Sequence, residues 1–198
     1  MISFLKKILK KLATLTIRKY QPAVIVITGS VGKTSTKEAV YTLLRNIRRV
    51  RSASGNFNNE LGVPLTIISS KTEIRGIFFW PKVILKAVLN LLFTRKYPEI
   101  LILEYAADKP GDIAYLLEIA KPQIGIVTAI GEVPVHVEYY SGPEEIAEEK
   151  GKVIEALFPM GFAVLNFDDE SVIRMKDKTR ARIITFGFGE GADIYISN

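Results

Sequence analysis

The stretch that decides the fold is Thr28-Gly29-Ser30-Val31-Gly32-Lys33-Thr34-Ser35. It follows an apolar, β-branched run at 23–28 and precedes a helical pattern at about 34–47, so it lies between a predicted buried strand and a predicted helix. Glycines in such a loop let backbone N–H groups and the helix N-terminus converge on anionic oxygens. Lys33 can then reach nucleotide phosphates, and the Thr34 hydroxyl can bind Mg²⁺. The context predicts a phosphate-binding loop rather than a glycine-rich turn without chemistry.

The loop is a short variant of the Walker motif. The spacing G-x-x-x-x-G-K-[ST] would require glycine at position 27, where the chain has Ile27. We expect ATP as the cofactor, and we expect its phosphates to be bound by Gly29, Ser30, Gly32, Lys33, Thr34 and Ser35.

The rest of the chain alternates between strand and helix patterns. Apolar runs at 100–105, 124–128, 162–166 and 183–186 predict further strands, and helices are expected at 113–120, 143–157 and 169–175. Residues 52–59 form a polar loop without apolar periodicity. This alternation predicts an α/β fold of the P-loop NTPase kind, a mainly parallel sheet flanked by helices, with ligands at the carboxyl ends of the strands.

Length and composition limit the number of domains and the expected compartment. A chain of 198 residues with 48% hydrophobic and 24% charged residues has room for one folded domain with appendages. It contains no cysteine, which excludes disulfides and thiolate metal sites and makes the cytoplasm the expected compartment.

The net charge of +6 comes from the N-terminal segment. Residues 1–19 contain six basic and no acidic residues, while the remainder is balanced, a distribution that argues against nucleic acid as a partner. Residues 1–21 form an amphipathic helical pattern that fits neither a secretory signal nor a membrane span. Two alternatives stay open: residues 1–19 lie on the inner face of the membrane, or the helix packs on its own domain.

A hydrophobic insertion interrupts the alternation at about 72–97. Within it, residues 76–93 are strongly apolar but carry Lys82 and Lys86 on one helical face, which favours a half-buried helix over a membrane span. Such a helix would cover the sheet or form a second membrane-surface element.

Several further motifs follow the loop in a fixed order. They are G-N-F-N-N-E-L-G-V-P-L-T at 55–66, L-E at 103–104, P-G-D-I-A-Y-L at 110–116, K-P at 121–122, V-T-A-I-G at 127–131, A-E-E-K-G at 147–151 and V-L-N-F-D-D at 164–169. Together with T-G-S-V-G-K-T-S-T-K-E at 28–38, they resemble the central ATPase domain of the Mur ligases over roughly residues 23–198. The resemblance is greatest to the branch that adds D-alanyl-D-alanine to the UDP-muramoyl tripeptide, and it assigns residues 22–198 to this domain.

The resemblance implies an ATP-dependent carboxylate–amine ligase of peptidoglycan precursor synthesis that works through an acyl phosphate. It implies ATP and Mg²⁺ as cofactors, and a UDP-muramoyl peptide and an amino acid or dipeptide as substrates. The implied catalytic residues are Lys33, His136 and Lys150, and the implied metal ligands are Thr34, Glu104 and His136. The resemblance also places Asn58 and Asn59 near the γ-phosphate and Asn166 near the adenine.

Each of these assignments has a structural alternative. Lys150 matches a family lysine that is carbamylated by CO₂, but a lysine among Glu148, Glu149 and Lys152 also fits a salt-bridged helix face. His136 lies about two residues farther from Gly131 than the family spacing, and its structural alternative is a lone surface or hydrogen-bonded histidine. Turn formation explains the asparagines of the 56–59 loop, and a polar strand end explains Asn166.

Two functions of different classes remain. Mur ligases carry flanking domains for the UDP-sugar and for the incoming amine, and this sequence has neither, which leads us to expect a fragment. The first hypothesis is therefore a ligase or its ATPase core. The second is a membrane-associated nucleotide-binding module that needs partner chains for any activity.

Overall fold

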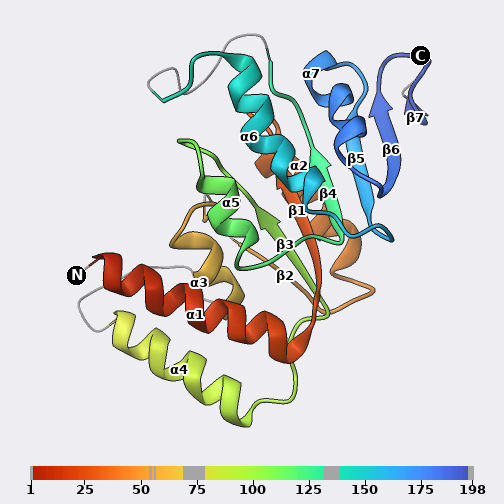
Figure 1. Ribbon diagram of the computed structural model, residues 1–198. Helices are drawn as coiled ribbons and strands as arrows, with labels where there is room; N and C mark the ends of the chain where they lie inside the picture. Colours follow the sequence, from red (N-terminus) through yellow and green to blue (C-terminus); the bar gives the residue numbers. More distant parts are fainter. Residues whose placement is uncertain (1, 54, 56, 69–78, 132–138, 196–198) are drawn as a thin grey trace.

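The computed structural model describes residues 2–53, 55, 57–68, 79–131 and 139–195, excluding the side chain of Ile2. Its described part contains a seven-stranded sheet in the order β2-β3-β1-β4-β5-β6-β7 (Figure 1). All paired strands are parallel. The strands are β1 (Ala23–Thr28), β2 (Val50–Ser52), β3 (Ile100–Glu104), β4 (Ile124–Val127), β5 (Phe162–Asn166), β6 (Arg182–Gly187) and β7 (Ile194–Tyr195). The predicted mainly parallel α/β sheet is confirmed.

Helices connect the strands and cover the sheet. They are α1 (Ile2–Tyr20), α2 (Lys33–Leu44), α3 (Gly62–Ile68), α4 (Phe79–Phe93), α5 (Asp112–Leu117), α6 (Pro143–Glu155), α7 (Glu170–Ile173) and the 3₁₀ helix η1 (Arg174–Lys178). Parallel strands need such crossovers, because a tight hairpin joins only antiparallel neighbours.

The register of the central strands brings the predicted site together. Strand β1 is buried along most of its length and pairs with β3 on one side and β4 on the other, with Ile27 opposite Glu104 and Thr28 opposite Val127. Because the three strands are parallel, the loops after their carboxyl ends emerge at one edge of the sheet. The loop at 29–32 therefore lies beside Glu104 and beside the segment that follows β4.

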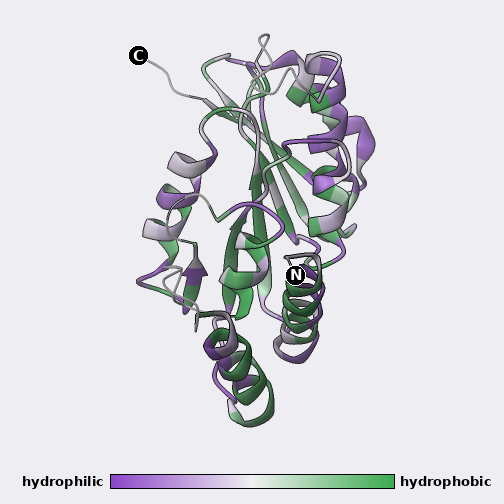
Figure 2. Cartoon of the chain, turned by 90° about the vertical axis from the view of Figure 1, so that its left-hand side faces the viewer, coloured by the Kyte–Doolittle hydropathy of each residue, from purple (hydrophilic) through white to green (hydrophobic). Residues whose placement is uncertain are grey.

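Helix α1 packs on its own domain. Leu9 and Ala13 are fully buried, and the helix contacts α3 and α4 (Figures 1 and 2). The predicted packing of this segment on its own domain is therefore observed, and its side chains Lys7, Lys11 and Arg18 remain exposed. The predicted helix in the insertion is present as α4, but it packs mainly against α1, so the expectation that it would cover the sheet is wrong. No helix in the described part of the chain is long and apolar enough to cross a membrane.

Strand β2 and helix α3 have no counterpart among the predictions. Strand β2 has only three residues, two of them polar, and its Arg51 guanidinium donates hydrogen bonds to the carbonyls of Thr66 and Ile67 at the end of α3. Helix α3 is buried along its whole length, so it has no polar face that would give a helical periodicity. Helix α2 ends at Leu44, three residues before the predicted boundary at Ile47.

Candidate nucleotide-binding site

The phosphate loop has a backbone that only glycine fits at Gly29. Its φ is +142°, and a Cβ atom built there would lie 2.1 Å from the Thr128 hydroxyl oxygen. Gly32 has φ +84° and immediately precedes α2, so the chain turns sharply into the helix. The loop thus presents the first N–H groups of α2 toward the edge of the sheet, as anion binding requires.

The end of β4 supports the loop from behind. The Ser30 N–H donates to the carbonyl of Ala129 at 2.5 Å, and the Thr128 hydroxyl donates to the carbonyl of Val31 at 2.6 Å. These bonds join the loop to the segment that follows β4. Thr128 is therefore part of the site, although sequence reasoning assigned it no role.

Glu104 is held by two neighbours. Its side chain is buried at the end of β3, where Oε2 accepts a hydrogen bond from the Thr34 hydroxyl at 3.1 Å and Oε1 accepts one from Asn58 Nδ2 at 3.0 Å. A hydroxyl and a carboxylate side by side at a phosphate loop are hard oxygen ligands of the type Mg²⁺ prefers, with water and nucleotide phosphates completing the shell. The residues present therefore fit a magnesium ion.

The described residues contain no cluster of three or more carboxylates and imidazoles that could hold a metal ion by themselves. His136, the predicted ligand of a second metal, lies outside the described residues.

Lys37 belongs to the same group. It is fully buried, its amine lies 3.7 Å from Glu104 Oε2, and it donates to the carbonyl of Gly55 at 2.9 Å. The cation offsets the buried negative charge of Glu104 and connects it to the loop after β2. Sequence reasoning missed Lys37, although its position one helical turn after Lys33 was a signal that both lysines share a face.

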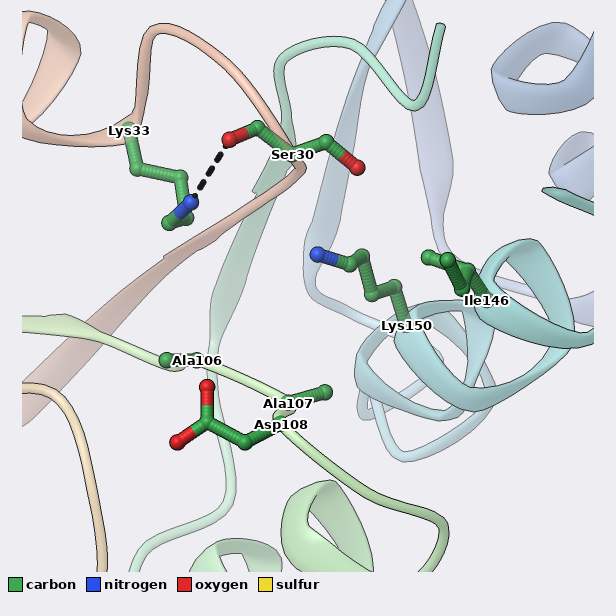
Figure 3. Close-up of a pocket in the computed structure, with 7 residues that line it drawn as sticks. All are labelled: Ser30, Lys33, Ala106, Ala107, Asp108, Ile146 and Lys150. Atoms are coloured by element: carbon green, nitrogen blue, oxygen red, sulfur yellow. Dashed lines mark hydrogen bonds between the residues drawn. The ribbon is translucent and has the colours of Figure 1, made fainter. Parts of the chain in front are cut away.

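A pocket opens beside the loop (Figure 3). It is lined by Ser30, Lys33, Ala106, Ala107, Asp108, Ile146 and Lys150. Lys33 and Lys150 approach it from α2 and α6, and their amines donate to loop carbonyls, Lys33 to Ser30 at 3.0 Å and Lys150 to Gly29 at 2.7 Å. Two lysines against the single carboxylate of Asp108 give the pocket lining an excess of positive charge, which attracts an anionic ligand.

Both lysines have depressed pKa values. Burial lowers the pKa of Lys33, while the carboxylates of Glu104 and Asp108 act in the opposite direction. Burial, assisted by repulsion from Lys33, lowers the pKa of Lys150 to about 8, with Asp108 opposing. Roughly a tenth of Lys150 is therefore an uncharged amine at pH 7, far more than of a solvated lysine on a helix face.

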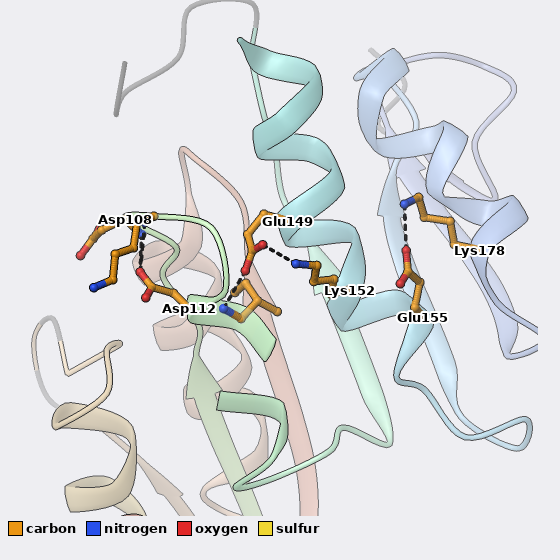
Figure 4. Close-up of polar contacts among 8 residues, drawn as sticks. Asp108, Asp112, Glu149, Lys152, Glu155 and Lys178 are labelled. Atoms are coloured by element: carbon orange, nitrogen blue, oxygen red, sulfur yellow. Dashed lines mark hydrogen bonds and ion pairs between the residues drawn. The ribbon is translucent and has the colours of Figure 1, made fainter. Parts of the chain in front are cut away.

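Two carboxylates make hydrogen bonds within and between the elements next to the pocket, and Figure 4 shows both, Asp112 near Asp108 and Glu149 on α6. Asp112 accepts hydrogen bonds from the N–H groups of Asp108 and Lys109, at 3.1 and 3.0 Å. Glu149 is buried and accepts one from the Ile113 N–H at 2.9 Å, which ties α6 to the start of α5. Lys150 and Asp108 are thereby held on facing elements.

Three more residues were predicted to contact the nucleotide: Asn59, Asn166 and Ser35. Asn59 Oδ1 accepts hydrogen bonds from the N–H groups of Leu61 and Gly62, so its side chain caps the N-terminus of α3. Asn166 lies at the carboxyl end of β5 and accepts from the Asp168 N–H at 3.0 Å. Ser35 is exposed in the first turn of α2. Nucleotide contacts by these three residues stay predictions.

Comparison with known proteins places this geometry in a family. The Mur ligase middle domain matches residues 27–77 and 84–198. The UDP-N-acetylmuramoyl-tripeptide–D-alanyl-D-alanine ligase of Mycobacterium leprae is 36% identical over 84% of this chain, which corresponds to 27% of that protein. The ligase of the same name from Bacillus subtilis is 28% identical over 96% of this chain and 35% of its own length.

Solved structures show the same relationship. MurF ligase from Thermotoga maritima, in complex with ADP, superposes with a TM-score of 0.73 and 32% identity, covering 98% of this chain and 39% of that one. MurF from Acinetobacter baumannii gives a TM-score of 0.71 at 27% identity, over 93% and 35% of the two chains. The chain spans about a third of the relatives it matches. It belongs to the family of the Mur ligase middle domain.

Proposed function

We propose that this chain is the ATP-binding core of a ligase that joins a carboxylate to an amine in peptidoglycan precursor synthesis. The observation that carries the proposal is the contact between Thr34, on the helix after the phosphate loop, and the buried Glu104, with Lys33 and Lys150 facing the adjacent pocket. The relatives named as ligases and the ADP-bound structural neighbour support this function over a module without activity of its own.

The chemistry explains why cations gather here. In the first step a substrate carboxylate oxygen attacks the γ-phosphorus of ATP, the bond to ADP breaks, and an acyl phosphate forms. In the second step an amine attacks the acyl carbon, inorganic phosphate leaves, and the amine loses a proton. The first step brings two anions together, so Lys33 and the N–H groups of α2 are placed to offset charge on the transferred phosphoryl group.

Mg²⁺ is the second proposed cofactor, held by the Thr34 hydroxyl and the Glu104 carboxylate. When bound, such an ion neutralises phosphate charge and orients the terminal phosphates. Asn58 and Lys37 hold Glu104 in the orientation that this role needs.

We also propose that Lys150 is carbamylated, as the resemblance implied. Only an uncharged amine attacks CO₂, and burial beside Lys33 favours that form of Lys150. The product is an anion next to Lys33 in place of a second cation. A carbamate signal in the ¹³C NMR spectrum with labelled bicarbonate, present in the unaltered protein and absent in Lys150→Met, is the expected result; equal spectra would contradict it.

The proposed substrates are a UDP-muramoyl peptide and an amino acid or dipeptide, since the relatives' names specify UDP-N-acetylmuramoyl tripeptide and D-alanyl-D-alanine. We propose a cytoplasmic protein that residues 1–19 bring to the inner face of the membrane. This is supported by the exposed cations Lys7, Lys11 and Arg18 on α1. Salt-dependent binding to anionic vesicles tests the membrane contact, and binding that is unaffected by Lys7→Glu with Lys11→Glu would count against it.

Phosphate release tests the ligase proposal. The chain within its full-length protein is given ATP and Mg²⁺ with no substrate, with each substrate alone, and with both. We expect phosphate release to rise severalfold only when both are present, together with a new amide product. Release at one rate in all four mixtures would contradict the proposal.

A further inference from the structure

The outward face of α4 is apolar and exposed. Its exposed apolar side chains are Leu85, Val88, Leu89, Leu92 and Phe93, and on the opposite side Val83 and Ala87 are buried against the domain. Phe93 is 76% exposed and Leu92 is 66% exposed. A stripe of large apolar side chains on one helix marks an interaction site, whereas scattered single residues do not.

Exposed cations lie on α4 itself and on the neighbouring α1. Residues 79–98 contain no acidic residue, and neither do residues 1–37. Lys82 and Lys86 are exposed on α4. On the neighbouring α1, Lys7, Lys11 and Arg18 are exposed, while Lys6 and Lys10 pair with Glu60 and Glu118 of the domain. The exposed part of the two helices is therefore cationic, because neither helix contains an acidic residue.

The two helices form one unit, which we call the α1–α4 platform (residues 2–20 and 79–93). The Lys19 amine donates to the carbonyl of Leu91 at 2.5 Å, at the negative end of the α4 dipole, and the Tyr20 hydroxyl donates to the carbonyl of Asn90 at 2.7 Å. Tyr20 also stacks on Tyr97, with ring centroids 4.5 Å apart. Figure 1 shows α4 at the outer end of the molecule, next to α1.

We propose that the α1–α4 platform docks on an anionic lipid bilayer, with the outward face of α4 inserted at the level of the acyl chains. This rests on the membrane association proposed above and changes the residues that carry it. The centre of the apolar side of α1 packs on the domain, because Leu9 and Ala13 are fully buried. Residues Leu89, Leu92 and Phe93 are free to insert, while lysines extend to the headgroups.

Charge decides between a bilayer and other occupants. A second copy docking through the same face would bring the cations of one platform against those of the other, at an energetic cost. An anionic surface is attracted by the same charges and also accepts the apolar stripe. Residues 78–83, where α4 begins, lie outside the match to the Mur ligase middle domain, which resumes at residue 84.

The test compares two matched pairs of substitutions in the full-length protein. The test variant, Leu92→Ser with Phe93→Ser, removes two large side chains from the apolar face of α4. The control variant, Leu43→Ser with Phe188→Ser, removes two side chains outside the platform that are 74% and 75% exposed. Co-sedimentation is measured with phosphatidylcholine vesicles and with vesicles that also contain phosphatidylglycerol, and ATP binding reports that each variant is folded.

We expect the unaltered protein to bind only the anionic vesicles, and the α4 variant to lose affinity by roughly tenfold or more, because buried apolar area supplies much of interfacial binding. The Leu43 and Phe188 variant should bind as the unaltered protein does. If Lys7→Glu with Lys11→Glu abolishes binding but the α4 variant binds normally, the insertion of α4 is refuted and membrane association stands. If the unaltered protein binds no vesicles, both the insertion of α4 and the membrane association are refuted. A dimer in solution that Phe93→Ser breaks would refute the bilayer as the partner of this face, because a second copy would cover it.

Discussion

The hydroxyl of Thr34 donates a hydrogen bond to Glu104 Oε2 at 3.1 Å, across 70 residues of sequence. The contact exists because β1 and β3 pair in parallel register, which brings the helix after one strand beside the last residue of the other. It joins the phosphate loop to the proposed metal ligand.

Glu104→Gln is expected to remove the effect of Mg²⁺ on nucleotide affinity. The amide keeps the size of the side chain but removes the charge that a divalent cation needs. Calorimetric titration with ATP should show affinity rising with Mg²⁺ in the unaltered protein and in the control Glu170→Gln, whose residue is exposed. An equal rise in Glu104→Gln would show that the carboxylate does not bind the metal.

Lys37→Met is expected to destabilise the fold, because it leaves Glu104 buried without its cation. Breaking a buried ion pair by removing one partner costs about 3–5 kcal/mol of the free energy of unfolding. The double variant with Glu104→Gln should lose less than the sum of the single losses, as urea denaturation can measure. Strictly additive losses would mean that the 3.7 Å contact contributes nothing.

Gly29→Ala is expected to lose both stability and nucleotide binding. The new Cβ meets the Thr128 hydroxyl, and the φ of +142° is strained for alanine, at a cost of about 1–3 kcal/mol for the backbone alone. Gly111→Ala is the matched control, since Gly111 has φ +94° but open space around its Cβ position. If both variants lose the same stability by thermal denaturation, the contact with Thr128 is not the cause.

Lys150 should make stability depend on pH in one direction. Its pKa is about 8 in the folded chain against an ordinary 10.5, so between these values the unfolded chain binds more protons than the folded one. The free energy of unfolding should therefore rise with pH across this window, by at most about 1.4 kcal/mol per pH unit from this residue.

Lys150→Met lacks this contribution. In buffers stripped of CO₂, the stability of the unaltered protein relative to this variant should increase between about pH 8 and pH 9.5, below the range in which tyrosines ionise. A constant or falling difference would contradict the lowered pKa.

Much of this site could be predicted because its signals are local. Gly29, Gly32, Lys33 and Thr34 stand in one loop between a buried strand and a helix, and Glu104 ends another buried strand. The alternation of patterns likewise predicted the parallel sheet. Lys37 and Thr128 were missed because their roles depend on partners that are far away in sequence, Glu104 and the loop carbonyl of Val31.

Helices α1 and α4 show a second limit of sequence reasoning. An amphipathic pattern indicates that one face is covered, but it does not say by what. The apolar side of α1 suits a membrane and a protein core equally, and only the packing on α3 and α4 separates them. For α3 the failure is of another kind, since a wholly buried helix of seven residues has no periodicity to detect.

The most direct test of the account is the affinity for ATP with Mg²⁺ of Lys33→Ala, with Lys176→Ala as the control at an exposed lysine. Removing a charged hydrogen-bond donor to phosphate should weaken binding by roughly tenfold to a hundredfold. The control should bind as the unaltered protein does. Unchanged tight binding by Lys33→Ala would contradict the claim that this loop holds the nucleotide.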